Sequence, residues 1–168
     1  HRLGIVSPLG NDASIALGTS EVTPLELTSA FVPFSNGGYP VTAYAVTRIL
    51  TRDGKVVYER NGSGFPKAIS DNDLWGMNRM MRLVVTDGTG TRANFPGFDI
   101  AGKTGTAQVN GQLDNAWFVG YAPANDPKIV LAIIIEEGLH GSTAARAATK
   151  MMERYLKARL TMTAIVND

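Results

Sequence analysis

The chain has no cysteine and only two histidines among its 168 residues. The lack of cysteine excludes disulfides, thiol nucleophiles, iron–sulfur clusters and cysteine-bound zinc. His1 and His140 are too few for a histidine-based metal site, because such sites need three or four protein ligands. We therefore expect neither a metal nor a cofactor.

The chain also has little net charge and no long apolar run. Sixteen basic and fifteen acidic side chains leave a net charge of +1 and are scattered, so we expect no nucleic acid partner. The longest apolar run, Ile129–Ile135, is far shorter than the roughly 18 residues of a membrane-spanning helix. Hydrophobic residues make up 44% of the chain, which indicates a folded domain with a core rather than a disordered segment.

Two helices are predicted in the first half of the chain. Thr23-Pro24-Leu25-Glu26 combines an N-cap threonine, a proline at the first helical position and the glutamate of a capping box, so a helix should begin there. Asn36-Gly37-Gly38 should end it. Ser70 is expected to cap the second helix. Its buried face should carry Leu74, Met77, Met81 and Val84.

Strands and a last helix fill the rest of the pattern. Val46–Leu50 and Lys55–Tyr58 flank Asp53-Gly54, which favours a hairpin with a type I′ turn. Three further strands with short connections should pair as antiparallel neighbours: 100–109, 116–122 and 129–135. Ser142 should cap a long C-terminal helix. The buried stripe of that helix is predicted to be Ala148, Met151, Met152 and Tyr155.

The stretch 97–108 fits two motifs of different mechanism. Gly97–Thr104 matches G-x-x-x-x-G-K-[ST], the phosphate-binding loop. Glu136, directly after the apolar stretch 129–135, is placed like the acid that helps to hold magnesium in proteins with that loop. That loop needs a strand before it and a helix starting at its lysine. Proline and polar residues precede it and glycines follow it, so neither condition is expected. Nucleotide binding is the least favoured hypothesis.

The second motif is K-T-G, at Lys103-Thr104-Gly105, which lies on a strand beside the acyl-transfer site of penicillin-binding proteins and serine β-lactamases. Alternation puts Lys103 and Gly105 on one face, where an ammonium stands beside a residue without a side chain. A carboxylate-bearing ligand would be attracted there. Thr104 and Thr106 add hydroxyl donors, and the Thr106 N–H suits an oxyanion hole. Alternation alone does not show how both threonines and the lysine reach one ligand.

Five blocks of sequence extend this match, in a consistent order: Ala16–Leu27, Phe34–Gly38, Gly88–Thr91, Ala101–Gln108 and Ala116–Pro123. With them the chain resembles the C-terminal part of a penicillin-binding protein transpeptidase domain, across roughly residues 14–157. The first block is closer to the bifunctional class A enzymes, whereas Gly102–Gln108 would also suit class B. The resemblance implies an α+β fold of the β-lactamase and D,D-peptidase superfamily. Its antiparallel sheet would hold the K-T-G strand and the two strands that follow.

The resemblance also implies a function. It predicts a peptidoglycan D,D-transpeptidase that acylates a serine with a D-alanyl-D-alanine stem peptide and passes the acyl group to an amine; β-lactams would trap the acyl-enzyme. Lys103 and Thr106 would be catalytic, and Thr104, Gly105, Thr106 and Gln108 would bind substrate. The family further implies a periplasmic location at the outer face of the cytoplasmic membrane. The membrane anchor would lie outside this chain.

The nucleophile of the family is not found here. The family attacks with the serine of S-x-x-K, and no serine of this chain has lysine three residues later. Ser70-Asp71-Asn72 spells the family's S-D-N element but lies too close to K-T-G, so we interpret Ser70 as a helix cap. We therefore expect residues 1–168 to be the C-terminal portion of one transpeptidase domain, with 161–168 as a tail.

Two consequences of this interpretation remain open at the level of sequence. The portion with the nucleophile would be a partner, in the same polypeptide or in another chain, and this chain would be inactive alone. Without that portion a large apolar face would be exposed unless a second chain covers it. The alternative hypothesis is a non-catalytic module of the same fold that binds cell-wall peptides.

Overall fold

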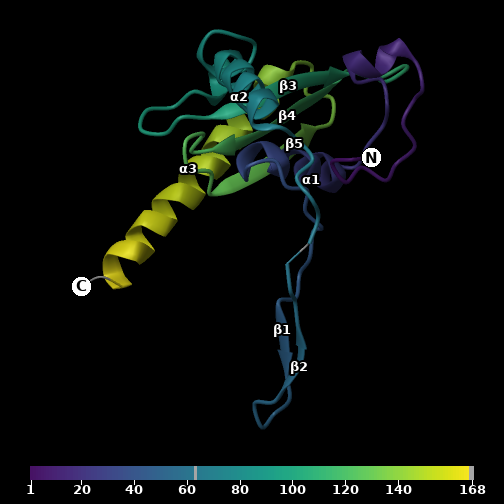
Figure 1. The fold of residues 1–168 in the computed structure, drawn as a ribbon. Coiled ribbons are helices and arrows are strands. Elements are labelled where there is room, and N and C mark those ends of the chain that lie inside the picture. The colour runs from purple at the N-terminus through teal and green to yellow at the C-terminus, as the bar shows by residue number, and fades with distance from the viewer. Residues whose placement is uncertain (63, 167–168) are drawn as a thin grey trace.

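The computed structural model describes residues 1–62 and 64–166, and the side chains of these residues as far as Ala158. It has three α-helices, five strands and two short 3₁₀ helices within that part of the chain (Figure 1). Their order is η1 (Ala13–Leu17), α1 (Pro24–Ser35), β1 (Arg48–Leu50), β2 (Val56–Glu59), α2 (Asp71–Thr86), η2 (Thr91–Ala93), β3 (Ala101–Ala107), β4 (Asn115–Ala122), β5 (Ile129–Ile135) and α3 (Gly141–Val166). None of the described helices combines the length and apolarity that a membrane crossing requires.

The main sheet has the order β3-β4-β5 and is antiparallel throughout, as the short connections predict. Helix α3 covers one face, while α1 and α2 lie against the other (Figure 1). Phe118, at the centre of β4, is fully buried on the α3 face. Tyr121, also on β4, is fully buried among residues of α1 and α2 on the opposite face. The chain is therefore an α+β sandwich of helices around one sheet, and the predicted fold class is confirmed.

Helix α3 supplies the largest core of the protein. Its buried apolar residues are the neighbours Ala144 and Ala145, followed at intervals of three or four positions by Ala148, Met152 and Leu156. Alanines in the first turns allow the helix to lie close to the sheet, and further along the helix the larger side chain of Met152 fills the space between helix and sheet. The prediction was wrong for Met151, which is 57% exposed, and for Tyr155, which is exposed as well. Period alone did not fix the angular position of the helix on the sheet.

The ends of α3 also differ from the prediction. The helix begins at Gly141, so Ser142 lies inside its first turn and is not the residue before it. A Cβ at Gly141 would come within 2.7 Å of the Gly105 carbonyl oxygen, which explains why glycine starts the helix at this contact with β3. At the other end the helix continues to Val166. The predicted tail 161–168 is thus helical as far as 166, and 167–168 lie outside the described residues.

The start of α1 follows from its sequence. Thr23 and Glu26 form the predicted capping box, and Pro24 is the first residue of α1. Glu26 also accepts hydrogen bonds from Val6 N and Ser7 N at 2.9 and 2.7 Å, so it ties the N-terminal segment to the helix. Hydrogen bonds from the Thr23 backbone N–H, then from the Ser7 hydroxyl and backbone N–H, hold the pKa of Glu26 well below its ordinary value. The α1 cap is therefore also the anchor of the N-terminal segment.

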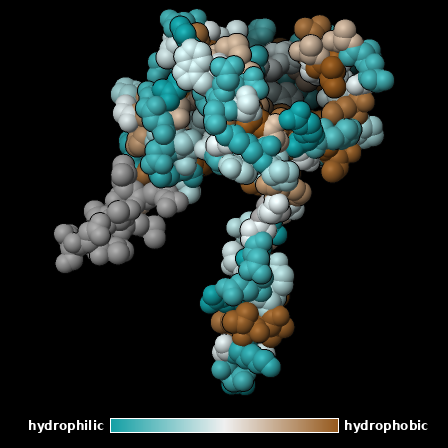
Figure 2. Space-filling model, viewed as in Figure 1, coloured by the Kyte–Doolittle hydropathy of each residue, from teal (hydrophilic) through white to brown (hydrophobic). Residues whose placement is uncertain are grey.

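A two-stranded arm, residues 40–62 and 64–66, projects from the body of the molecule (Figure 1). Its strands β1 and β2 are antiparallel, as predicted. The type I′ turn is wrong: Gly54 N donates to Thr51 O, and of the loop residues only Gly54 has a positive φ. This is a three-residue loop closed by a left-handed glycine. Figure 2 shows apolar side chains on the arm, where Ile49, Leu50, Val56 and Val57 are exposed.

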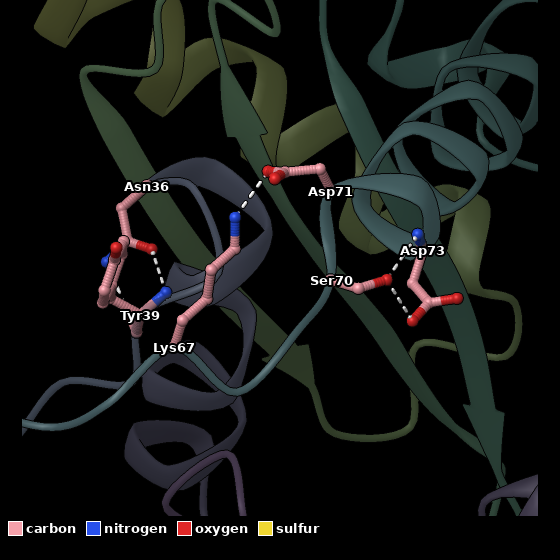
Figure 3. A network of polar contacts seen from close by, with 6 residues as sticks. All are labelled: Asn36, Tyr39, Lys67, Ser70, Asp71 and Asp73. Carbon is pink, nitrogen blue, oxygen red and sulfur yellow. Dashed lines mark hydrogen bonds and ion pairs between the residues drawn. The ribbon is translucent and has the colours of Figure 1, made fainter.

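The base of the arm is fixed by polar contacts (Figure 3). Where the chain leaves α1, Asn36 Nδ2 donates to the Tyr39 carbonyl at 2.7 Å, and Tyr39 N donates back to Asn36 Oδ1 at 3.0 Å. Where the chain returns, Lys67 Nζ lies 2.5 Å from Asp71 Oδ1 in the first turn of α2. Both ends of the arm are thereby attached to helices of the body.

Candidate functional site

The K-T-G residues lie in the middle of β3, which is an edge strand of the main sheet. No helix starts at Lys103: the strand runs from Ala101 to Ala107 and pairs with β4 over its whole length. The loop-to-helix geometry that a phosphate-binding loop requires is therefore contradicted. An edge strand instead leaves alternate backbone N–H and C=O groups free of a strand partner.

Lys103 presents a positive charge at this edge. Its side chain is exposed, and Nζ donates to the carbonyl oxygen of Thr104 at 2.6 Å. None of the ion pairs found among the described residues includes Lys103. The ammonium therefore has hydrogen-bond donors and charge available for an anion that approaches β3.

The two threonines of the site differ in environment. Thr104 is only 7% exposed, and its Oγ1 lies 2.5 Å from the Oγ1 of Thr89. Thr106 is exposed and pairs with Ala116 near the end of the strand. Both pair with core residues of the α3 face, Ala116 and Phe118. Thr104 and Thr106 thus share one face of β3, as alternation requires.

Lys103 and Gly105 share the opposite face, which is the face of α1 and α2. They pair with Val119 and Trp117 on β4. A Cβ at Gly105 would lie 3.3 Å from the Cβ of Trp117, so a side chain here would press on the half-buried tryptophan. The side chains of Lys103 and of the two threonines therefore lie on opposite faces of β3, and these faces meet at its free edge.

Gln108 is exposed and lies one residue beyond β3. A cavity of about 430 Å³ opens next to it, at the end of the sheet. The cavity is lined by Val109, Gln112, Asn115, Glu136 and Glu137. Asn115 Oδ1 already accepts a hydrogen bond from Glu137 N at 3.0 Å. Gln108 itself is not part of this lining, so the structure does not bring it together with the polar side chains of the cavity.

Two residues of this neighbourhood were not assigned to the site by sequence reasoning. Thr89 contacts Thr104, and Gly141 packs against Thr104 and Gly105 from the start of α3. Thr89 lies in Gly88–Thr91, one of the blocks that carry the family resemblance, and this was the available signal. Nothing in the local pattern shows that this turn returns to the K-T-G strand, because the contact spans 15 positions and depends on how α2 packs.

Ser70 has the structural role predicted for it. Its Oγ accepts from Asp73 N at 3.2 Å and donates to Asp73 Oδ2 at 2.7 Å, so it caps α2 (Figure 3). The literal S-D-N sequence is therefore a helix start. In the described part of the chain, no three histidine, aspartate or glutamate side chains gather in the manner of metal ligands.

Comparison with known proteins identifies the family. The family model described as "Penicillin binding protein transpeptidase domain" matches residues 7–155. The chain belongs to the penicillin-binding protein transpeptidase family. That match covers β3, the arm and all but the last turns of α3.

Individual members of the transpeptidase family agree with this assignment. Penicillin-binding protein 1A of Neisseria gonorrhoeae is 39% identical over 134 residues, which are 77% of this chain and 16% of that protein. The peptidoglycan D,D-transpeptidase MrdA of Acinetobacter baumannii is 34% identical over 170 residues, 87% of this chain and 24% of that protein. The crystal structure of the D,D-transpeptidase domain of a peptidoglycan glycosyltransferase from Eggerthella lenta superposes with a TM-score of 0.68 at 31% identity, covering 89% of this chain and 37% of that one. The chain thus spans less than half of each of these proteins.

Proposed function

We propose that this chain forms the K-T-G part of the active site of a peptidoglycan D,D-transpeptidase. Residues 1–168 would be the C-terminal portion of the transpeptidase domain, and a segment with S-x-x-K would complete the site. The single observation that carries this proposal is the exposed ammonium of Lys103 on an edge strand, with Gly105 beside it and hydroxyls on the adjoining face. This arrangement suits a peptide that ends in a carboxylate.

Binding would use both the charge and the edge of β3. The carboxylate of the terminal D-alanine would accept hydrogen bonds from Lys103 and from the hydroxyls of Thr104 and Thr106. The peptide backbone would run along β3 and pair with its free N–H and C=O groups, as an added strand does. Gly105 has no side chain that would hold the peptide backbone away from the strand.

The chemistry would proceed in two acyl transfers. The serine Oγ attacks the carbonyl carbon of the penultimate D-alanine, and the C–N bond to the terminal D-alanine breaks when that amine takes a proton. An amine of a neighbouring strand then attacks the ester carbon, forms the new amide and returns the proton to the serine. The Thr106 N–H would stabilise the oxyanion of each tetrahedral intermediate, and Lys103 would help proton transfer through its positive field.

The same geometry supports β-lactams as ligands, since they combine a reactive amide with a carboxylate. A β-lactam would acylate the serine and remain bound as an ester. Peptidoglycan is the substrate, so the reaction would take place in the periplasm, at the outer face of the cytoplasmic membrane. The second partner of this chain would be the segment that bears S-x-x-K, in the same polypeptide or in another chain.

Covalent labelling with fluorescent penicillin tests this proposal. The protein that carries both this chain and an S-x-x-K segment should form a labelled adduct that resists boiling in detergent. Lys103→Ala should abolish most of the labelling, because the carboxylate loses its charged partner and charged hydrogen bonds contribute about 1.5–3 kcal/mol each, or more than tenfold in rate. Lys128→Ala is the matched control, since Lys128 is an exposed lysine of the connection between β4 and β5 that pairs with Asp126.

Two results would contradict the proposal. Equal labelling of Lys103→Ala and wild type would show that Lys103 does not serve the site. Correct folding with no adduct in the wild type would favour the alternative, a cell-wall peptide-binding module without catalysis.

A further inference from the structure

The turn that follows α2 delivers a hydroxyl to the K-T-G strand. Thr89 lies in this turn between Gly88 and Gly90. A Cβ at Gly88 would lie 2.8 Å from the Cα of Val84, and a Cβ at Gly90 would lie 3.1 Å from the Val84 carbonyl oxygen. Gly90 N also donates to that carbonyl at 2.9 Å. The turn is therefore packed directly on the last turn of α2, and Thr89 has a fixed place relative to β3.

Thr104 is enclosed from two sides. Its Oγ1 lies 2.5 Å from the Thr89 Oγ1. On another side a Cβ at Gly141 would come within 2.8 Å of the Thr104 Cβ, so α3 begins in contact with this side chain. With 7% of its surface exposed, Thr104 has little freedom to choose another rotamer. Thr89, in contrast, is exposed.

The proton of each hydroxyl decides what the pair can do. A hydroxyl has one proton to donate and two lone pairs that accept. If Thr104 donated to Thr89, it would have no proton left for an anion. If Thr89 donates, Thr104 keeps its own proton, and the first hydrogen bond polarises the second. A carboxylate only accepts, so it favours the second arrangement.

We propose that Thr89 is a positioning residue of the transpeptidase site: it donates its hydroxyl proton to Thr104 Oγ1, so that Thr104 donates its own proton to the carboxylate of the substrate or β-lactam. This inference rests on the proposed function. Thr89 thereby determines how well the site distinguishes ligands with a terminal carboxylate from neutral analogues. One hydrogen bond, between Thr89 in the turn from α2 to η2 and Thr104 on β3, would thus control this specificity.

The test compares a β-lactam acid with its ester in the protein that carries both this chain and an S-x-x-K segment. Rate constants for acylation are measured with benzylpenicillin and with benzylpenicillin methyl ester. Thr89→Val, which keeps the shape and removes the hydroxyl, should slow acylation by the acid about five- to tenfold, the value of one hydrogen bond. It should change acylation by the ester less than about twofold. Thr89→Ser should restore the acid rate.

Two further variants separate positioning from general support. In a Thr104→Val background, Thr89→Val should cause no further loss with the acid, because the two residues act through one hydrogen bond. Thr91→Val, two residues further along at the start of η2, is the matched control and should leave the ratio of acid to ester rates unchanged. If valine at 89 prevents folding, Thr89→Ala takes its place, with Thr89→Ser as the rescue.

The outcomes are distinct. An equal loss with acid and ester would show that Thr89 only supports the strand, and full activity of Thr89→Val with the acid would show that its hydroxyl has no role; either result overturns the inference. Both leave the proposed function intact if Lys103→Ala abolishes acylation. If the wild type is not acylated and Lys103→Ala behaves the same, the proposed function has failed and this inference fails with it.

Discussion

Two neighbouring methionines on α3 provide a sharp test of the core. Met152 is fully buried, whereas Met151 is 57% exposed. Met152 belongs to the cluster that joins α3 to β4 and β5, together with Phe118 and Leu131. Met152→Ala should leave a cavity between the helix and the sheet, and Met151→Ala should remove only a side chain that faces water.

The expected magnitudes differ widely. Replacing a buried methionine with alanine costs about 2–5 kcal/mol, as lost transfer free energy plus the cost of the cavity. An exposed substitution stays within about 0.5 kcal/mol, and alanine is the better helix former. For a chain of this size, 1 kcal/mol corresponds to about 2–4 °C in Tm. Met152→Ala should therefore lower the Tm by roughly 4–20 °C and Met151→Ala should change it by less than about 2 °C.

Urea unfolding of the chain, followed by far-UV circular dichroism, measures both free energies of unfolding. The slope with urea should stay the same in the two variants, so that the midpoint reports stability. A loss in Met151→Ala equal to or greater than that in Met152→Ala would refute the placement of α3 on the sheet. Losses below 0.5 kcal/mol in both would refute the core contact itself.

Other regions give three further predictions. Glu26 has a lowered pKa in the folded chain, so its carboxylate stabilises the fold above the unfolded-state pKa of 4.5 and this contribution is lost as the pH falls. In urea unfolding, the stability difference between wild type and Glu26→Gln should shrink between about pH 5 and pH 2. A stability difference that does not change with pH would contradict this. Tyr121 has a fully buried hydroxyl with no hydrogen-bond partner among the described residues, and burial raises its pKa to about 12. Tyr121→Phe should therefore leave the Tm unchanged or higher, and a loss of more than about 1 kcal/mol in the free energy of unfolding would reveal a partner for the hydroxyl. A Cβ at Gly102 would lie 2.5 Å from Phe118 Cζ, whereas a Cβ at Gly76 in α2 would meet nothing within 4 Å. In thermal melts Gly102→Ala should lower the free energy of unfolding by about 1–3 kcal/mol, and Gly76→Ala should raise it by about 0.5–1 kcal/mol. A change of the same sign in both variants would be inconsistent with the packing.

Local signals predicted most elements of the fold. The capping box at Thr23 and the serine cap at Ser70 each satisfy backbone N–H groups within a few residues, so the helix starts could be read directly. The three strands of the main sheet have short connections, which leave antiparallel neighbours as the simple solution. The turn of the arm was assigned to the wrong type, because Asp53-Gly54 is compatible with more than one loop length.

The candidate site was predicted in part. Lys103 and Gly105 share a face of an edge strand, as alternation indicated. The partner of Thr104 was missed, because Thr89 comes from another element and meets Thr104 only after α2 has packed against β3. The proposed role of Gln108 stays a prediction, and so does the covering of exposed apolar residues such as Leu17 and Trp75 by a further segment or chain.

By itself the sequence determined the order of the elements, the helix caps and the strand that bears Lys103, since these depend on bonds and spacings within a few residues. Only the tertiary structure decided which side of α3 is buried and that Thr89 reaches Thr104. These outcomes depend on contacts between residues far apart in the chain. Such contacts are set by packing, to which a local pattern of residue types contributes only one of the two surfaces.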